Sequence, residues 1–193
     1  MIQEQLAAVI LASGRSTRFG ENKLLHLIGG QPMIEKLFSA LPKDLFSQII
    51  VVSMYDPILE LAARRGCLPV YNDDQTDDIA KTIALGIEAV DPAASGCMFF
   101  VSDQPWLKTQ TILRLASRFD KEPQNIHVPL CGGRQGNPVV FPARFFEQLR
   151  SLPRGCGGKT LCRQYPDSVS FLSVDDPLEL KDIDRKTDLP PIR

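Results

Sequence analysis

The sequence Leu6-Ala7-Ala8-Val9-Ile10-Leu11-Ala12-Ser13-Gly14 is an apolar run that ends in a small polar turn. A strand in the middle of a parallel sheet is covered on both faces, so it is apolar throughout and does not alternate with polar residues. The run has the length of a strand and is bounded by a glycine-containing turn. We therefore predict that residues 6–12 form the first strand of a parallel sheet and lie at its centre.

Strand and helix patterns alternate along the rest of the chain. Short apolar runs predict further strands at residues 48–53, 68–71, 97–101 and 126–129. Apolar residues spaced three and four apart predict helices that begin at Pro32 and at Asp56, and others over residues 79–90, 109–119, 143–149 and 158–164. This alternation predicts an α/β fold of three layers, Rossmann-like, with a mostly parallel sheet covered by helices on both faces. No repeat or long linker divides the chain, so we expect one domain over residues 1–193.

Composition and charge exclude several classes of protein. Of the 193 residues, 44% are hydrophobic and 23% are charged, as in ordinary globular proteins and unlike disordered or fibrous ones. The formal charge of −1 gives no general affinity for nucleic acid or for a membrane surface. No apolar stretch approaches the roughly 20 residues that span a bilayer. We expect neither nucleic acid nor membrane among the partners.

The cysteines and the amino-terminal residues indicate a compartment. The five cysteines are an odd number and contain no Cys-x-x-Cys pair. The first 30 residues lack the basic start and the long apolar run of a signal peptide. Both observations predict a reduced, cytoplasmic protein.

The segment after the first strand, residues 11–23, combines two glycines and small polar residues with three cations. In open α/β sheets ligands bind beyond the carboxyl ends of the strands, where this segment is expected. Glycines let backbone N–H groups approach an anion, and Arg18 and Lys23 supply positive charge to phosphate oxygens. The segment favours a polyphosphate ligand, although a glycine-containing turn after a strand is about as often only structural.

Two familiar phosphate motifs do not fit. A dinucleotide fingerprint needs a glycine where Ser16 stands. The run Gly157-Gly158-Lys159-Thr160 looks like the end of a P-loop, but Pro153 stands where its first glycine should be.

A carboxylate follows the predicted strand at residues 97–101. Asp103 lies in the sequence Ser102-Asp103-Gln104-Pro105, directly beyond that strand. A carboxylate opposite a phosphate-binding loop can place a divalent cation such as Mg²⁺ between protein and substrate oxygens. Asp103 is therefore a candidate metal ligand, and the alternative is that it only caps the turn before Pro105.

These motifs resemble those of the MobA-like nucleotidyltransferases, in particular the molybdenum cofactor cytidylyltransferases. Family members carry a pattern like L-A-[AG]-G-x-S-x-R-[MF]-G-x-x-K-L after the first strand, and residues 11–24 match it at nearly every position. The likeness continues in order through Gly30-Gln31-Pro32-Met33, Ser102-Asp103-Gln104-Pro105, Gly136-Asn137-Pro138 and Asp182-Ile183-Asp184.

The resemblance implies a reaction, its substrates and its site residues. A terminal phosphate oxygen of molybdopterin would attack the α-phosphorus of CTP and release pyrophosphate, with Mg²⁺ as cofactor. By position, Arg18, Lys23 and Asp103 would be catalytic, and Asp103 and Asp184 would hold Mg²⁺. The nucleotide would contact Leu11, Ala12, Ser13, Gly14, Arg15, Ser16, Gly20, Lys23 and Thr82, and the acceptor Gly136, Asn137 and Pro138. The product would pass to a molybdenum hydroxylase of the xanthine dehydrogenase type or to its maturation chaperone.

The choice of base and acceptor leaves alternatives. Side chains on Ser13 and Thr82 would fill space that a purine needs, which favours CTP over GTP. The alternatives are guanylyl transfer from GTP, transfer to a sugar or alditol phosphate, and a non-enzymatic nucleotide carrier. The chain also departs from the family pattern: Asp78 replaces a glycine, Gly155 to Thr160 lack an expected aspartate, and Arg185-Lys186 replace a Thr-Pro.

Overall fold

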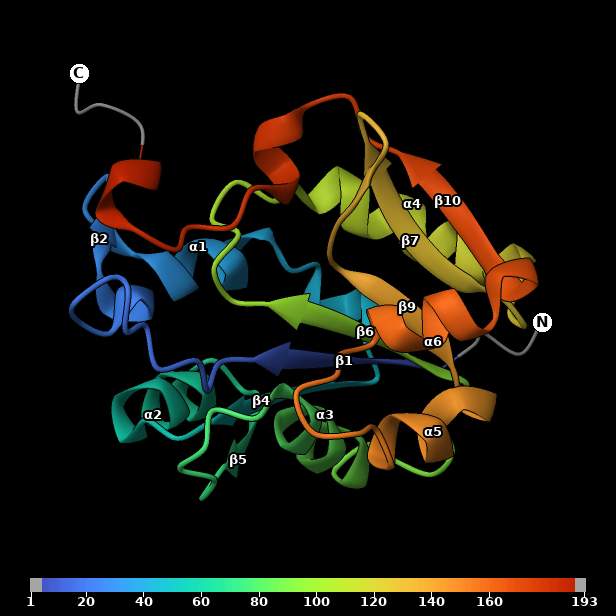
Figure 1. The fold of residues 1–193 in the computed structure, drawn as a ribbon, viewed down its shortest axis with the longest axis horizontal. Helices are drawn as coiled ribbons and strands as arrows, with labels where there is room; N and C mark the ends of the chain where they lie inside the picture. Colours follow the sequence, from blue (N-terminus) through green and yellow to red (C-terminus); the bar gives the residue numbers. More distant parts are fainter. Residues whose placement is uncertain (1–4, 190–193) are drawn as a thin grey trace.

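The computed structural model describes residues 5–189 and contains an eight-stranded sheet with strand order β10-β7-β9-β6-β1-β4-β5, in which β8 pairs with β7 (Figure 1). The strands are β1 (Leu6–Leu11), β4 (Gln48–Ser53), β5 (Leu68–Tyr71), β6 (Gly96–Val101), β7 (Ile126–Cys131), β8 (Arg134–Gln135), β9 (Val139–Pro142) and β10 (Val169–Ser173). A separate hairpin joins β2 (Leu27–Ile28) to β3 (Gln31–Pro32). The helices are α1 (Met33–Ala40), α2 (Asp56–Arg64), α3 (Ile79–Glu88), α4 (Thr109–Lys121), α5 (Phe146–Arg150) and α6 (Lys159–Gln164).

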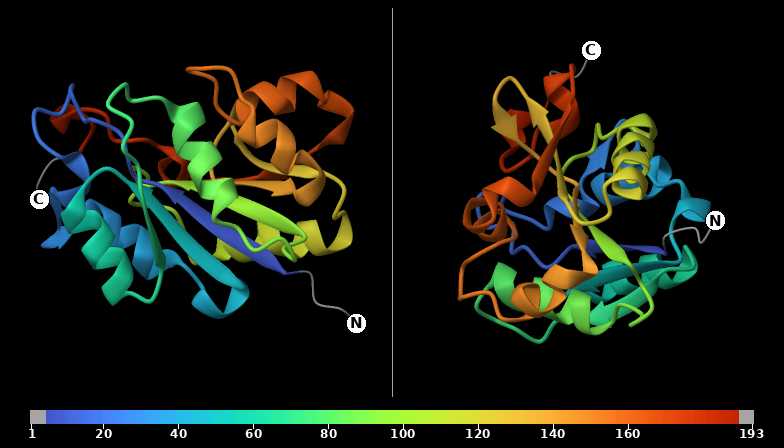
Figure 2. Two further views of the ribbon diagram at one scale, coloured as in Figure 1. Left: turned by 90° about the horizontal axis from the view of Figure 1, so that it is seen from below. Right: turned by 90° about the vertical axis from the view of Figure 1, so that its right-hand side faces the viewer.

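Strand β1 is buried on both faces, as its continuous apolar sequence predicts. Ala8 and Ile10 pack into one core with side chains from α1, α2 and α4. Ala7 and Val9 pack into a second core with α3, α5 and α6. Figure 2 shows helices on both faces of the sheet. The predicted three-layer α/β fold is therefore confirmed.

The strand order places a topological switch beside β1. From β1 the chain moves outward through β4 and β5, and then returns to β6 on the other side of β1. Strands β4 and β6 both run parallel to β1. Connections therefore leave the carboxyl ends of β1 and β6 in opposite directions, which opens a crevice between them.

The segment after residue 130, which the sequence left irregular, contributes β8, β9 and the edge strand β10. Strand β9 lies between β6 and β7 and is antiparallel to both. Strand β9 is hard to recognise from the sequence, because it has only four residues, begins directly after Pro138 and ends at Pro142. Its position depends on a pairing with β6, in which Phe99 lies opposite Val139. That pairing is a long-range contact that local sequence patterns do not report.

The other predicted elements agree with the structure within a few residues. Helix α1 begins at Met33, one residue after the proline that marks its start, and residues 143–145 form a 3-10 turn before α5. The described residues include all five cysteines, and none of them forms a disulfide. Within residues 5–189, every helix is too short or too polar to cross a lipid bilayer.

Helix α3 approaches β1 so closely that only glycine fits at residue 86. A Cβ atom added to Gly86 would lie 2.6 Å from Cγ1 of Val9. We predict that Gly86→Ala lowers the free energy of unfolding by about 1 kcal/mol, because overpacking outweighs the gain in helix propensity. In a Val9→Ala background the same change should raise that free energy, since the clashing methyl is gone. Urea unfolding followed by circular dichroism measures both differences, and an effect of the same sign in both backgrounds would contradict the packing argument.

Candidate active site

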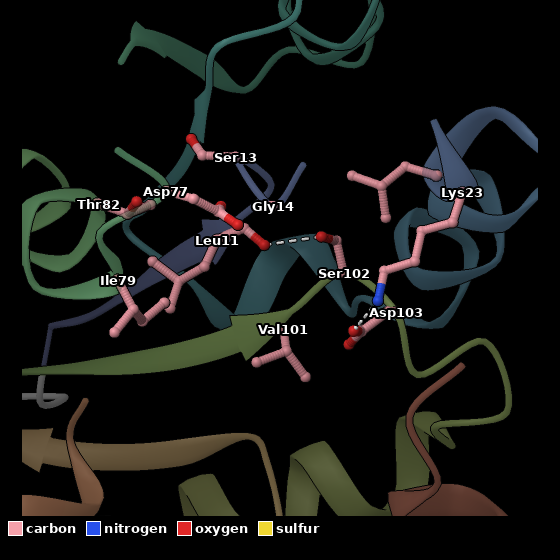
Figure 3. Close-up of a pocket in the computed structure, with 11 residues that line it drawn as sticks. Leu11, Ser13, Gly14, Lys23, Asp77, Ile79, Thr82, Val101, Ser102 and Asp103 are labelled. Carbon is pink, nitrogen blue, oxygen red and sulfur yellow. Dashed lines mark hydrogen bonds and ion pairs between the residues drawn. The ribbon is translucent and has the colours of Figure 1, made fainter. Parts of the chain in front are cut away.

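A cleft with roughly 570 Å³ of empty space lies at the carboxyl ends of β1 and β6. Figure 3 shows Lys23 and Asp103 at one end of it, and Ser13, Ile79 and Thr82 at the other. The Ser102 hydroxyl donates to the Leu11 carbonyl at 2.7 Å and so ties the two strand ends together. The lining residues are Leu11, Ser13, Gly14, Lys23, Leu24, Asp77, Ile79, Thr82, Val101, Ser102 and Asp103. The cleft thus has a charged end at Lys23 and Asp103, and an end that is uncharged apart from Asp77.

The charged end is a cluster of ion pairs centred on Lys23. Its Nζ atom lies 2.7 Å from Oδ2 of Asp103 and 3.1 Å from Oδ1 of Asp184. Arg18 reaches the other oxygen of Asp184 at 3.0 Å. The three catalytic candidates of the sequence, Arg18, Lys23 and Asp103, therefore meet here together with Asp184.

The lysine is held in place by its local structure and by its charge partners. Residue Asn22 accepts a hydrogen bond from the Leu24 N–H and starts the 3-10 turn Lys23–Leu25, which directs Lys23 into the cleft. Burial by itself lowers the pKa of Lys23, but the charges and hydrogen bonds of Asp103 and Asp184 outweigh burial and raise that pKa above its usual value. The ammonium is therefore charged and fixed between two carboxylates.

Asp184 reaches the cleft because the segment that carries it is fastened to the loop after β6. The Ile183 N–H donates to the Asp103 carbonyl at 2.9 Å. The Gln104 amide donates to the Leu180 carbonyl at 3.2 Å and to Oδ1 of Asp182 at 2.8 Å. Because Gln104 is only 2% exposed, it forms a buried clamp between the two segments.

A third carboxylate, Asp182, lies close enough to Asp103 and Asp184 to sense their charge. Burial raises the pKa of Asp182, the charges of Asp103 and Asp184 raise it further, and the hydrogen bond from Gln104 and the charge of Lys159 oppose this change. The negative charges of Asp103 and Asp184 therefore act on Asp182 in the same direction as its burial.

Asp103 and Asp184 are suited to hold a divalent cation jointly with a ligand. Oδ1 of Asp103 is buried and has no hydrogen-bond partner among residues 5–189. Over the same residues, no group of three or more His, Cys, Asp or Glu side chains forms a metal centre by itself. Magnesium ions commonly take one or two carboxylates and complete their shell with substrate phosphates and water. The donor set fits that kind of ion.

The loop between β1 and the Lys23 turn presents unpaired backbone donors. Within the described chain, no hydrogen bond engages the N–H groups of Gly14, Ser16 or Thr17. Ser16 adopts a φ of 54° and Gly20 a φ of 86°, which curl the loop back on itself. The Ser16 hydroxyl accepts from the Lys23 N–H at 3.3 Å and ties the loop to the charged end. Such a loop can hold phosphate oxygens.

Ala12 and Arg15, which the resemblance places at the nucleotide, form hydrogen bonds within the protein. Both backbone groups of Ala12 are used inside the protein, because its N–H donates to Val52 and its carbonyl accepts from the Ser53 hydroxyl. The Arg15 N–H donates to Asp77 at 3.3 Å, and the guanidinium binds the carbonyl and side chain of Gln75. Arg15 therefore fastens the loop after β1 to the loop after β5.

The uncharged end contains a buried hydrogen-bonded group. Ser13 and Thr82, which are 6% and 4% exposed, both accept hydrogen bonds from the side-chain amide of Asn72, at 3.2 and 3.1 Å. The structure thus brings together two residues that are 69 positions apart in the sequence. Asn72 itself was not expected from any motif.

A second cavity with roughly 930 Å³ of empty space adjoins the first. The two share Leu11, Ile79 and Val101 as lining residues. Of the acceptor candidates, Asn137 lines the second cavity, whereas Gly136 packs against Leu180, whose side chain a Cβ atom at Gly136 would meet at 2.8 Å. Pro138 is buried behind Asn137 and follows it through a cis peptide bond.

Asp78, which departs from the family pattern, links the start of α3 to the loop before α6. One carboxylate oxygen, Oδ1, accepts from the Ala80 N–H at 3.0 Å, and so caps α3, and from the Gly155 N–H at 2.9 Å. The loop before α6 is therefore fixed against the start of α3.

The sequence analysis missed Gln104, Asn72, Asp77 and Asp182 as parts of this site. Gln104 and Asp182 lie inside matched motifs, so the motifs themselves carried a signal for them. Asn72 and Asp77 lie in a polar loop after β5, and their roles depend on side chains from distant segments.

Comparison with known proteins gives one family match. The family model described as MobA-like NTP transferase domain matches residues 8–169. The chain is 30% identical over 118 residues to a probable molybdenum cofactor guanylyltransferase from Aquifex aeolicus (strain VF5). That alignment covers 61% of this chain and 55% of the relative, so the chain matches little more than half of the relative's length.

Two solved structures share the fold over nearly the whole chain. The structure of Rv0371c from Mycobacterium tuberculosis H37Rv superposes with a TM-score of 0.80 at 23% identity, covering 97% of this chain and 96% of that one. A nucleotidyl transferase from Methanothermobacter thermautotroptrophicus gives a TM-score of 0.81 at 20% identity, covering 95% and 94%.

The Gln104 clamp gives a test of how Asp184 is positioned. We predict that Gln104→Ala lowers the free energy of unfolding by about 1–3 kcal/mol, because it removes two hydrogen bonds made by a buried amide and leaves a cavity in its place. Hydrogen–deuterium exchange of the Ile183 amide should accelerate. Gln110→Ala, at an exposed position on α4, serves as the control. Unchanged protection of Ile183 in the Gln104 variant would show that the clamp does not hold this segment.

Proposed function

The chain belongs to the MobA-like NTP transferase domain family and is a nucleotidyltransferase, and we propose that it transfers CMP from CTP to the terminal phosphate of molybdopterin. One observation carries the proposal most strongly. A cleft at the switch point between β1 and β6 has the Lys23, Asp103 and Asp184 cluster at one end and the Ser13 and Thr82 hydroxyls at the other. The first end suits phosphates, and the second suits a base.

In the proposed reaction one phosphate oxygen of the acceptor attacks the α-phosphorus of CTP. A new P–O bond forms, the bond to the β-phosphate bridging oxygen breaks, and pyrophosphate leaves with that electron pair. Because the anhydride is already activated, the enzyme has chiefly to align the two phosphates and to neutralise their charge. No covalent nucleophile is required.

The charged residues meet this demand. The unpaired N–H groups of the loop at residues 13–17 and the guanidinium of Arg18 would hold the triphosphate, and Lys23 would neutralise charge at the reacting phosphate. Asp103 and Asp184 would hold Mg²⁺, which when bound supplies positive charge to the phosphate oxygens. Lys23 is already pinned between these two carboxylates, so little reorganisation of the protein is needed at the moment of reaction.

The proposed preference for CTP is supported by the uncharged end of the cleft. Ser13 and Thr82 both carry side chains there, and both are almost fully buried. A one-ring base leaves room for such side chains where a two-ring base does not. The competing candidate is guanylyl transfer from GTP, which the name of the Aquifex aeolicus relative favours.

The second cavity is the proposed site of the acceptor. Its floor includes Phe99, Phe141 and Leu149, which suits a flat body better than a sugar with many hydroxyls to satisfy. Lys159 lines the same cavity, which adjoins the first through the shared residues Leu11, Ile79 and Val101. A molybdenum hydroxylase or its chaperone as recipient, and a cytoplasmic setting, remain parts of the proposal.

The metal-binding carboxylate can be tested directly. We predict that Asp103→Asn lowers Mg²⁺-dependent pyrophosphate release by two to three orders of magnitude. A charge interaction at about 4 Å is worth roughly 4 kcal/mol at an effective dielectric constant of 20. Lys23→Gln should have a similar effect. Asp120→Asn, an exposed change on α4, is the control, with circular dichroism to confirm folding. Full activity of Asp103→Asn would remove this residue from the proposed chemistry.

The base preference can be ranked without the acceptor. We expect Mg²⁺ with CTP to raise the melting temperature more than Mg²⁺ with UTP, ATP or GTP at equal concentration, because a ligand that binds only the native state stabilises it more the tighter it binds. Differential scanning fluorimetry measures all four shifts in one experiment. A larger shift with GTP would reassign the proposal to guanylyl transfer.

A further inference from the structure

We infer that Asn72 is a positioning residue that closes the uncharged end of the cleft and thereby sizes it for a one-ring base. The inference rests on the proposed function, since it concerns the base of the nucleotide bound there. It deepens that function by naming a residue that no motif singles out. The argument uses the contacts of Asn72 and of the two hydroxyls it joins.

The side-chain amide of Asn72 braces two walls of the cleft against each other. Its Nδ2 atom donates to Oγ of Ser13 at 3.2 Å and to Oγ1 of Thr82 at 3.1 Å. Ser13 belongs to the loop after β1, and Thr82 to the first turn of α3. Because both oxygens lie on one nitrogen, they are at most 6.3 Å apart, the sum of 3.2 and 3.1 Å. No ring can pass between them.

Asn72 is itself held firmly. It is 2% exposed and follows β5 directly. Its backbone N–H donates to the Ser53 carbonyl at 2.9 Å, and its side-chain oxygen accepts from the Asp74 N–H at 3.0 Å. Both donor hydrogens and the acceptor of the amide are therefore used. The side chain cannot turn without losing buried hydrogen bonds, each of which is costly to leave unmade.

The two hydroxyls are also held from behind. The Ser13 hydroxyl donates to the Val52 carbonyl at 3.4 Å, and the Thr82 hydroxyl donates to the Asp78 carbonyl at 3.2 Å. Each hydroxyl thus bridges a backbone carbonyl and Asn72. Moving either one aside to admit a second ring would break two hydrogen bonds.

Both braced side chains line the cleft, opposite the phosphate end. Figure 3 shows Ser13 and Thr82 on the side of the cleft away from Lys23 and Asp103. A base that extends from a triphosphate at the charged end would meet this wall. The wall accommodates a pyrimidine, and a purine would press against it unless the brace were removed.

The test compares affinities for CTP and GTP, each with Mg²⁺, by isothermal titration calorimetry. In the wild type we expect CTP to bind more tightly. In Asn72→Ala the removal of the amide frees both hydroxyls and leaves space behind them, and we expect the preference for CTP over GTP to fall about tenfold. Thr82→Val keeps the shape of the wall but removes one acceptor of the brace, so it should shift the ratio in the same direction by less.

Controls separate this role from general stability. Asn125→Ala removes an amide that only bonds Glu122, remote from the cleft, and should leave both affinities unchanged. A purely structural role for Asn72 predicts that both affinities fall by the same factor, and that outcome would overturn the inference. If Asn72→Ala does not fold, an unchanged ratio in Thr82→Val overturns it equally. Failure of the wild type to bind either nucleotide would instead overturn the proposed function.

Discussion

The ion cluster at Lys23 is the interaction on which the candidate site depends. The ammonium joins Asp103, 80 residues away, to Asp184, 161 residues away. The attraction is strongest between Lys23 and Asp103, whose side chains are the most buried of the cluster, while Asp184 and Arg18 are more exposed to solvent screening. Three segments that share no local sequence relationship are thereby drawn to one end of the cleft.

The packing of the sheet makes this cluster possible. Because β1 is buried on both faces, its carboxyl end is fixed, and the loop that leaves it can turn only into the crevice beside β6. Asp103 follows β6 directly, and the Gln104 clamp brings the segment of Asp184 alongside. The phosphate-binding loop and the carboxylates therefore face each other across the gap where the strand order reverses.

The cleft is asymmetric in its chemistry, and this asymmetry gives it a direction. At one end carboxylates and cations form ion pairs. At the other end the Ser13 and Thr82 hydroxyls are neutral and are hydrogen-bonded within the protein through the amide of Asn72, and Asp77 is the charged residue beside them. A nucleoside triphosphate has the same division between an anionic tail and a neutral base. The adjoining second cavity supplies space for an acceptor next to the reacting end.

Local sequence patterns were enough to predict the central strand, the alternation of strands and helices, and the loops that carry Lys23 and Asp103. Burial on both faces demands a continuous apolar run, and ligand loops follow strand ends. Asp184 follows no predicted strand and was expected only from the resemblance to the MobA-like family. The three-dimensional structure was needed to show that β9 enters the sheet antiparallel between β6 and β7, that Arg15 fastens two loops together, and that Asn72 braces Ser13 against Thr82. Each of these depends on a contact between residues that are remote along the chain. The energy of such a contact depends on three-dimensional proximity and leaves no periodic trace in the sequence.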